Sequence, residues 1–421
     1  PHESDFINGK RILWFAPGVG LVKMDYHHAD GTLTTAQLVR YSLASDNQDL
    51  WPLSLTNEWT YRWQSGYRDE PVYETWSLVP MDALDTKPPP REKLLAMDRA
   101  EYTVMINEPT RRLARVRCEL VPQADSPGVI ELFLKNAHAN NQPDGFAHYI
   151  HDFKAADHQG TSLHVDQPAR DQWRIIVKKP GPVRFTYTVL LNHDHDNWRY
   201  GPDEAPYVRE DCVFWSASAL FIAPRSEPNH LQVTFQVPDN WNVSTPWHAL
   251  DPNQHVFSLS HRDELIETYL ATGPYESALA KSGNTEVLLA VGGDMERPKG
   301  ILFETVDGFL QGYARLFDGA PDRKILVVAH RNLQRSGMDG GVYGSSVSML
   351  FPERLSRTNL NRWAPFVGHE LFHVWNGQAI KYQEQEYWFS EGFTDYYCQV
   401  LAVRLGLITE EAFLHNLKKA C

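Results

Sequence analysis

The spacing of apolar residues changes once along this chain of 421 residues, and that change limits the folds the chain can adopt. From residue 101 to about residue 262, apolar and polar residues alternate, as they do in 115–120, 183–189 and 231–237. A period of two is typical of strands that bury one face. Strands at this density predict an antiparallel β-sandwich.

After about residue 263, apolar residues lie three and four positions apart, which is typical of helices. Residues 303–317 show this spacing and predict a helix. Residues 324–329 are a short apolar run that predicts a strand, and residues 341–351 predict a second strand, rich in small polar residues. Further helices are expected near residues 365–376, 390–405 and 409–419. This part of the chain therefore predicts an α+β domain.

Two earlier segments complete the domain plan. Short aromatic-rich stretches at 11–19, 21–26 and 59–63, separated by Gly and Asp, predict β-strands and turns. Residues 87–92, Lys-Pro-Pro-Pro-Arg-Glu, predict an extended linker because consecutive prolines remove backbone donors. We therefore expect three domains: a β-rich N-terminal accessory region over 1–90, a β-sandwich over 99–262 and the α+β domain over 263–421.

Charge and composition exclude several classes of function. The formal net charge is −13, whereas nucleic-acid-binding proteins concentrate Lys and Arg, so we expect no nucleic-acid partner. No run approaches the roughly 18 apolar residues of a membrane helix, so we expect no membrane span. The four cysteines include no C-x-x-C pair, which disfavours a metal site built from thiolates.

Residues 369–373, His-Glu-Leu-Phe-His, form an H-E-x-x-H motif. On a helix, residues four apart share one face with Cβ atoms about 6 Å apart, so two imidazoles can bind one metal ion. Pro365 near the first turn and Asn376-Gly377 beyond the end favour such a helix. The motif alone can also arise by chance in a chain with 18 histidines. A third ligand is therefore needed to support a metal site.

Glu391 supplies that third ligand. It follows His373 after 17 intervening residues, an interval that fits a turn and a returning helix. Two histidines and a glutamate with an open fourth position are typical of hydrolytic zinc. Asp395 lies four residues later on the same helical face, where it can accept the free N–H of a ligating histidine. The sequence thus predicts one zinc ion on His369, His373 and Glu391, with Glu370 as general base.

At these residues the chain resembles the glycyl aminopeptidase family of gluzincin zinc metallopeptidases, whose members often carry a PDZ domain. The resemblance rests on His-Glu-Leu-Phe-His-Val-Trp-Asn at 369–376 and Trp-Phe-Ser-Glu-Gly-Phe-Thr-Asp-Tyr-Tyr at 388–397. Weaker similarity extends upstream to about residue 100. The resemblance implies a thermolysin-like catalytic domain preceded by the β-sandwich, with the zinc ligands and the general base named above.

The resemblance also implies that residues 341–351 are the edge strand along which a peptide backbone binds. Candidate substrate-binding residues are therefore Gly340, Gly341, Val342 and Tyr343. Family members with aminopeptidase activity have Gly-Gly-x-Glu-His here, and the Glu holds the free amine of the substrate. This chain has a tyrosine at 343, and a neutral phenol cannot pair with an ammonium as a carboxylate does. Aminopeptidase and endopeptidase activity therefore both stay open.

Two other features depart from the family pattern. Many members have a longer insertion between the second histidine and the glutamate ligand. The tyrosine that stabilises the oxyanion in the family lies well downstream of that glutamate, and this chain ends 30 residues after Glu391. We therefore expect the domain over 263–421 to be incomplete at its C-terminal end. Tyr396 and Tyr397 are interpreted as helix-packing residues.

The sequence thus predicts a zinc-dependent hydrolase of peptide or protein substrates, with a secreted or periplasmic location. The alternative is a peptide-binding module that keeps zinc without turnover. The histidine-rich segment 192–197 offers a second metal-binding candidate, but a solvated loop between strands is favoured because such residues are common in turns.

Overall fold

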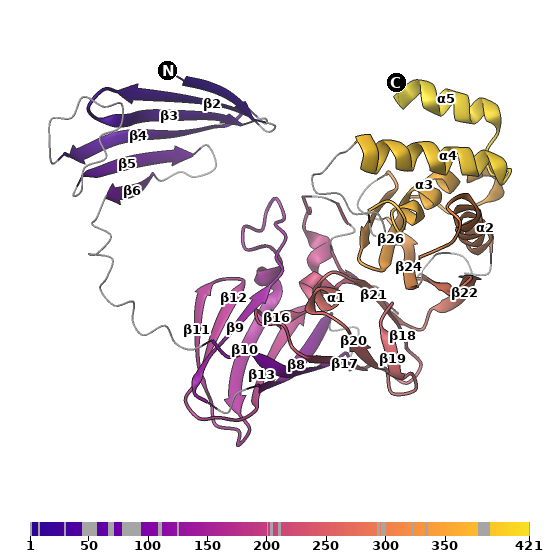
Figure 1. Cartoon of the computed structure of the whole chain (residues 1–421), viewed down its shortest axis with the longest axis horizontal. Helices are drawn as coiled ribbons and strands as arrows, with labels where there is room; N and C mark the ends of the chain where they lie inside the picture. Colours follow the sequence, from indigo (N-terminus) through magenta and orange to yellow (C-terminus); the bar gives the residue numbers. More distant parts are fainter. Residues whose placement is uncertain are drawn as a thin grey trace. The chain divides into compact units, whose positions relative to one another are not determined.

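The protein is described by a computed structural model (Figure 1). The structure describes residues 2–6, 9–28, 31–43, 57–65, 71–77, 94–107, 112–123, 126–199, 201–202, 205–208, 212–292, 295, 300–321, 323–332, 336–377 and 388–420. The chain divides into two compact units, Pro1–Glu92 and Lys93–Cys421. The expected linker at 87–92 lies outside the described residues, and the boundaries expected at 90, 99 and 262 stay predictions.

The first unit is a single six-stranded antiparallel sheet in sequence order. Its core holds Leu21, Trp59 and Tyr61, and the tyrosine hydroxyl donates to the Leu21 carbonyl at 2.8 Å. The β-strands predicted for this region are therefore confirmed. The strands are β1 His2–Phe6, β2 Gly9–Ala16, β3 Gly20–His28, β4 Leu33–Ser42, β5 Glu58–Ser65 and β6 Val72–Ser77.

The second unit begins with two sheets that share one hydrophobic core. The larger sheet has the order β10-β13-β8-β7-β17-β20-β19 and the smaller one β11-β12-β9-β16. The strands of the larger sheet are β7 Met97–Met105, β8 Leu113–Pro122, β10 Ile150–Asp157, β13 Val183–Leu190, β17 His230–Gln236, β19 His248–Asp251 and β20 Val256–Leu259. Those of the smaller sheet are β9 Gly128–Leu134, β11 His164–Ala169, β12 Gln172–Val177 and β16 Ile222–Pro224.

Alternating side chains build this core as the sequence predicts. In β13, Val183, Phe185 and Tyr187 are buried while the residues between them are more exposed. One expectation is wrong: the sandwich is not wholly antiparallel, because β17 pairs with β7 in parallel. Both strands bury alternate residues whichever way they run, so the period of two cannot give their relative direction.

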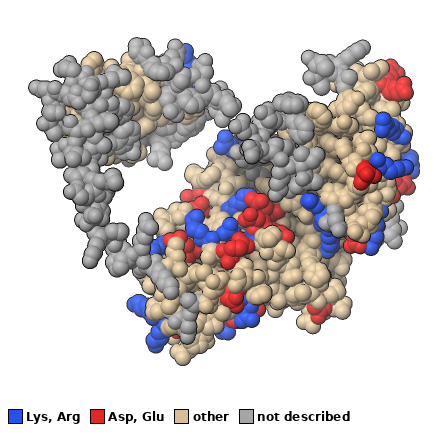
Figure 2. All heavy atoms as spheres, viewed as in Figure 1, with Lys and Arg blue, Asp and Glu red and all other residues tan. Residues whose placement is uncertain are grey.

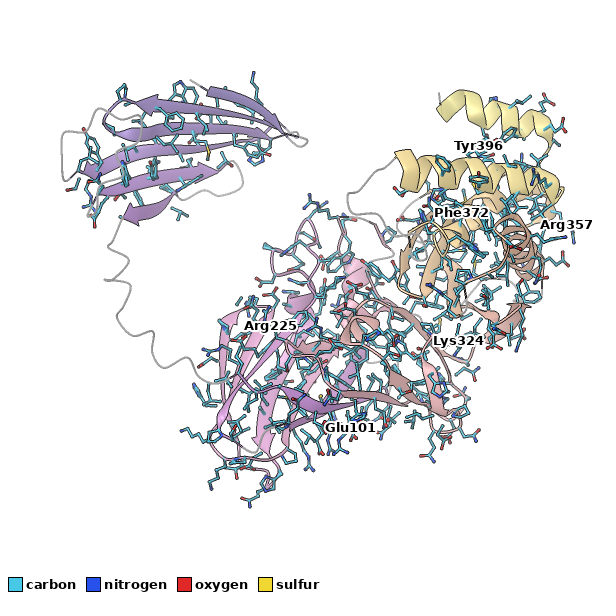
Figure 3. All side chains as sticks on the ribbon, in the orientation of Figure 1. Glu101, Arg225, Lys324, Arg357, Phe372 and Tyr396 are labelled. Carbon is cyan, nitrogen blue, oxygen red and sulfur yellow. The ribbon has the colours of Figure 1, made fainter. Side chains whose placement is uncertain are left out.

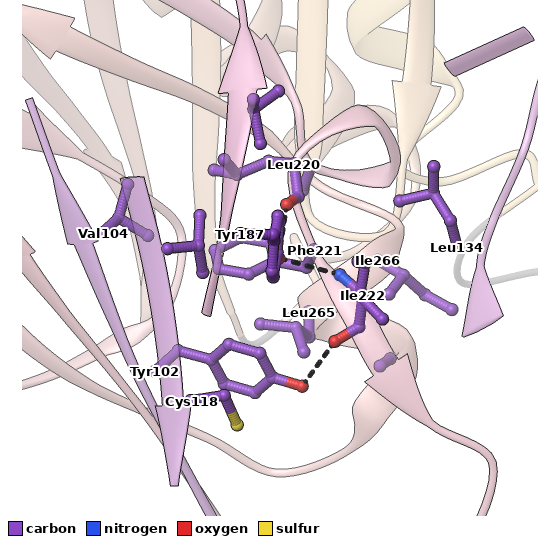
Figure 4. Close-up of a cluster of buried hydrophobic side chains, with 14 of the residues drawn as sticks. Tyr102, Val104, Cys118, Leu134, Tyr187, Leu220, Phe221, Ile222, Leu265 and Ile266 are labelled. Carbon is purple, nitrogen blue, oxygen red and sulfur yellow. Dashed lines mark hydrogen bonds between the residues drawn. The ribbon is translucent and has the colours of Figure 1, made fainter. Parts of the chain in front are cut away.

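Two buried tyrosines hold the segment that leads into β16 (Figure 4). The Tyr102 hydroxyl donates to the carbonyl of Ile222 at 2.9 Å. The Tyr187 hydroxyl donates to the carbonyl of Leu220 at 2.8 Å and accepts from the N–H of Ile222 at 3.0 Å. Burial raises the pKa of both phenols well above the usual value, so both stay neutral donors.

Replacing Tyr187 by Phe should lower the free energy of unfolding by about 1–3 kcal/mol, because a buried N–H and a buried carbonyl lose their partner. Chemical denaturation followed by tryptophan fluorescence would measure the change. Tyr396→Phe is the control, since Tyr396 is 48% exposed and should change stability by less than about 0.5 kcal/mol. Equal stabilities for the two variants would contradict the role assigned to Tyr187.

The second unit also contains a small sheet, whose strands alternate along the chain with those of the sandwich, and a five-stranded sheet. The small sheet has the order β14-β15-β21-β18, and the larger one β22-β23-β24-β26-β25. The small sheet comprises β14 Tyr207–Val208, β15 Val213–Ser216, β18 Asn242–Ser244 and β21 Tyr269–Gly273. The larger one comprises β22 Glu276–Ser282, β23 Thr285–Val291, β24 Lys324–Arg331, β25 Asp339–Tyr343 and β26 Ser346–Phe351.

The five-stranded sheet is covered on both faces. In the central strand β24, Ile325 and Val327 pack into the cluster formed with the helices, whereas Leu326 and Val328 pack against the small sheet. Strands covered on both faces read as continuous apolar runs, which is why residues 324–329 were recognisable as a strand. The strand predicted over 341–351 is instead a hairpin. Its two strands, β25 and β26, pair antiparallel, and Gly344 takes the positive φ of 54° that the turn requires.

Helices α2, α3 and α4 pack on one face of this sheet, with α3 and α4 adjacent (Figure 1). The expected helical segments are confirmed: α2 Ile301–Leu316, α3 Leu360–Phe372, α4 Phe393–Arg404 and α5 Glu410–Ala420, preceded by the short α1 Arg262–Ile266. Pro365 is inside α3 rather than in its first turn, because the helix begins five residues earlier than the sequence suggested.

No helix in the described part of the chain is long and apolar enough to cross a membrane. On the face shown in Figure 2, Lys and Arg side chains are interspersed with Asp and Glu side chains over the second unit. Within the sandwich, Arg184 forms an ion pair with Glu119 at 2.6 Å. The second unit is thus sheet-rich with few helices, and its charged surface is mixed in sign.

Candidate metal centre

Two helical segments carry the predicted ligands to one place. His369 and Glu370 lie in the last turn of α3, and His373 caps its C-terminal end. Glu391 lies in a π-helical turn, η8 Trp388–Gly392, that runs directly into α4. A π turn widens the helix and shifts the side chains that follow it, and such turns are frequent at functional sites.

The three ligand atoms converge. The Nε2 atoms of His369 and His373 are 3.2 Å apart, and Oε2 of Glu391 is 3.3 Å and 3.7 Å from them. Atoms bound to one zinc at about 2.0–2.2 Å in tetrahedral geometry lie roughly 3.3–3.6 Å from one another. The observed separations fit a single zinc ion, and His369, His373 and Glu391 form a set of possible metal ligands in the described residues.

The second nitrogen of each ring, Nδ1, forms a hydrogen bond on the side away from the centre. Nδ1 of His369 lies 2.8 Å from Oδ1 of Asp395, and Nδ1 of His373 lies 3.2 Å from the carbonyl oxygen of Asn376. Both partners are acceptors, so each Nδ1 carries a proton and donates, and each Nε2 faces the centre. A contact between Asp395 and one of the two histidines was expected because Asp395 lies four residues after Glu391 on the same helical face, and the structure shows that the histidine is His369.

Asn376 also joins the two segments. Its side-chain amide donates to the carbonyl of Ser390 and to the hydroxyl of Thr394, both at 3.2 Å. The Thr394 hydroxyl in turn donates to the Ser390 carbonyl. All three residues are buried, at 2%, 4% and 0% exposure, so these bonds are shielded from water. The sequence identified Asn376 only as a helix stop, because nothing in its spacing marks a contact 14 and 18 residues away.

The charges of the site suit a cation. Burial opposes a proton on His369, but hydrogen bonds to Asp395, Cys398 and Glu391 outweigh burial and raise the pKa of His369 to about 12. Burial and the neighbouring His369 charge lower the pKa of His373. The hydrogen bond from His369 lowers the pKa of Glu391. The carboxylates therefore stabilise positive charge between the rings, which is the requirement for holding a divalent ion.

Glu370 lies between the ligands and the edge of the sheet. It is 7% exposed, and a Cβ added to Gly340 would lie 2.8 Å from its carboxyl carbon. Glycine at 340 therefore lets β25 approach the helix closely. The same added atom would lie 2.8 Å from the Ser348 carbonyl oxygen, so the strand cannot shift to make room.

The predicted substrate-binding residues Gly340, Gly341, Val342 and Tyr343 all lie on β25. In the described part of the chain, β25 is the last strand of its sheet, so the structure places these residues on an edge. The Tyr343 ring stacks on Tyr269 with centroids 4.9 Å apart. Gly340 contacts Glu370, whereas Tyr343 lies three residues further along the strand.

The two tyrosines that follow Glu391 differ. Tyr397 packs against the rings of Phe317, Phe372 and Phe393, which agrees with a packing role. Tyr396 is half exposed on α4 (Figure 3), and its ring contacts only the edge of the Tyr397 ring among the ring contacts of the described residues. No contact of either hydroxyl marks it as the donor to an oxyanion.

The histidine-rich segment 192–197 does not form a solvated loop throughout. His193 is fully buried and stacks on Tyr149 with centroids 3.8 Å apart. Burial lowers the pKa of His193 to about 3, so the ring is neutral. Its surroundings are aromatic, and the metal-ligand groups found in the described residues do not include it.

Comparison with known protein families agrees with this geometry. Residues 101–272 match the Peptidase M61 N-terminal domain, and residues 362–421 match the M61 glycyl aminopeptidase domain. The two matches come from one family and together cover more than half of the chain. The chain belongs to the M61 glycyl aminopeptidase family. The family suggested by residues 369–376 and 388–397 is therefore confirmed. Among curated protein sequences, none matches the chain.

Solved structures show a similar fold. The structure resembles an aminopeptidase N family protein from Idiomarina loihiensis with a TM-score of 0.59 and 20% sequence identity. The match covers 75% of this chain and 56% of that one, so this chain spans little more than half of that protein. An M1 zinc metallopeptidase from Deinococcus radiodurans matches with a TM-score of 0.44 and 15% identity over 74% of this chain and 72% of that one. The sheet-rich architecture is thus aminopeptidase N-like.

Replacing Asn376 by Ala should weaken zinc binding by about ten- to a hundredfold, because the side-chain bonds from α3 to η8 and α4 are lost. Competition with a chromophoric chelator would measure the affinity. Asn359→Ala is the matched control, since it removes an amide at the opposite end of the same helix, where Asn359 bonds Ser356 and Trp363. Equal zinc affinities for the two variants would show that Asn376 does not position the ligands.

Proposed function

We propose that the chain is a zinc-dependent metallopeptidase. The observation that carries this proposal is the convergence of two Nε2 atoms and one carboxylate oxygen within 3.2–3.7 Å of one another, next to a buried glutamate. Two histidines and a glutamate leave one position open on a tetrahedral ion, which is the arrangement of catalytic rather than structural zinc. Membership of a peptidase family supports the same reading.

The chemistry follows from the positions of the residues. Zinc bound there would supply a Lewis acid and lower the pKa of water in the site. Glu370 lies beside the ligands, where it can accept a proton from the attacking water and return it to the leaving amine. Asp395 and the Asn376 carbonyl accept from Nδ1 of the two imidazoles, which leaves both Nε2 atoms facing the centre, where they would bind zinc.

We further infer a thermolysin-like arrangement of this region, with the substrate lying along β25. Among the described residues β25 is the outermost strand of its sheet. Because residue 340 is a glycine, the strand can approach Glu370 closely. An extended peptide that pairs with this edge would pass the general base without obstruction from a side chain at 340. The substrate is therefore a peptide or an extended segment of a protein.

Glu370→Gln tests the mechanism most directly. The amide keeps the size of the side chain but cannot accept the proton, so peptide hydrolysis should fall by at least about a hundredfold. Zinc content, measured by metal analysis, should stay at one ion per chain. Removal of zinc by a chelator should abolish activity, and added zinc should restore it. Wild-type activity in Glu370→Gln would reject Glu370 as base, and zinc binding without hydrolysis of any peptide would indicate a binding module.

A further inference from the structure

An ion pair from the sandwich region of the second unit lies next to Tyr343, the last residue of β25. Lys135 is the first residue after β9, and Glu267 is the first residue after α1. Their side chains form an ion pair. The Lys135 ammonium also lies over the Tyr343 ring, 5.5 Å from its centroid. A cation from the sandwich thus sits against the last residue of the edge strand.

The end of the strand is fixed in place. The Ser346 hydroxyl donates to the carbonyl of Tyr343 at 2.6 Å and accepts from the N–H of Tyr269 at 2.7 Å. The Tyr269 ring stacks on the Tyr343 ring. The ring under the Lys135 ammonium is therefore held by backbone and ring contacts.

A cavity of about 260 Å³ opens at the same place. Lys135, Arg199 and Tyr343 contribute to its wall, and no Asp or Glu lines it among the described residues. The side chains of Lys135 and Glu267 are 40% and 43% exposed, so a ligand can reach the pair from solvent. Basic groups in a partly enclosed space attract a carboxylate and repel an ammonium.

The position of this cavity along a bound peptide follows from the strand geometry. Gly340 is the residue of β25 that lies next to Glu370, the proposed general base. Tyr343 lies three residues, or about 10 Å, further along the strand. Antiparallel pairing is slightly more stable per residue than parallel pairing. A peptide in that direction would place its amino side at Tyr343 and Lys135.

We infer that Lys135 is a specificity-determining residue that occupies the amino-side subsite with its own ammonium. This inference rests on the proposed peptidase function. A substrate carrying a free ammonium there has to displace Lys135 from Glu267, and it meets repulsion from that charge. A substrate carrying a carboxylate or a neutral group pairs with Lys135 or leaves it undisturbed. The site therefore favours an acidic or blocked amino side over a free amino terminus.

One peptide in three forms tests this: N-succinylated with a carboxylate, N-acetylated, and with a free amine. For the wild type, kcat/KM should fall in that order by about three- to fivefold per step, the range of partly exposed charge pairs. In Lys135→Met, Glu267 is uncovered, and the free-amine peptide should become the preferred one. Lys154→Met removes an exposed lysine on β10 and is the control, which should keep the wild-type order.

Binding provides a readout without turnover. Calorimetry of the three peptides with zinc-loaded Glu370→Gln, alone and combined with Lys135→Met, should show the same reversal in Kd. Glu267→Gln should strengthen the preference for the succinylated form, because Lys135 then lacks its partner. The same charge series at the carboxyl end should be insensitive to residue 135.

The outcomes separate the two proposals. Hydrolysis that depends on Glu370 but shows one order of preference in wild type and Lys135→Met would overturn the role of Lys135 and leave the peptidase standing. If residue 135 changed the preference only for charges at the carboxyl end of the peptide, the proposed direction of the bound peptide would be overturned. A protein that neither binds nor cleaves any of the peptides would overturn both.

Discussion

The contacts of Asn376 are the interaction on which the metal centre depends. Its carbonyl orients His373, and its side chain holds the segment that carries Glu391. The two Nε2 atoms lie 3.2 Å apart, a separation that holds only while both rings keep their orientation. Buried hydrogen bonds hold them because a donor that lost its partner in the core would cost about 1–3 kcal/mol.

The layers around the site explain how it stays rigid. The five-stranded sheet has helices on one face and the small sheet on the other, so each face of β24 packs into a separate buried cluster. Gly368, directly before His369, lets α3 approach α2: an added Cβ would lie 2.4 Å from the Phe309 ring. Interiors packed this closely do not deform gradually, so the position of α3 relative to β25 is well defined.

The sequence predicted the elements better than their pairing. Local spacing identifies the helix α3 and the strand β24, and it singles out His369, His373 and Glu391, whose side chains converge in the structure, because each depends on residues close together or on a known interval. The parallel pairing of β7 with β17 and the hairpin in 339–351 depend on contacts that spacing does not encode. The ion pair of Lys135 with Glu267 and the side-chain bonds of Asn376 could not be predicted for the same reason, since these partners are separated by 14 to 132 residues.

The Asn376 side chain bonds Ser390 and Thr394, which lie on either side of Glu391 in the chain, so these contacts fix the position of Glu391. Closing a flexible loop costs only about 0.6 kcal/mol more for each doubling of its length. Residues can therefore be inserted after position 377 at little cost to the metal centre, provided that both ends keep their hydrogen bonds. The interval between the second histidine and the glutamate is thus a place where evolution can add substrate-contacting segments while the chemistry stays unchanged.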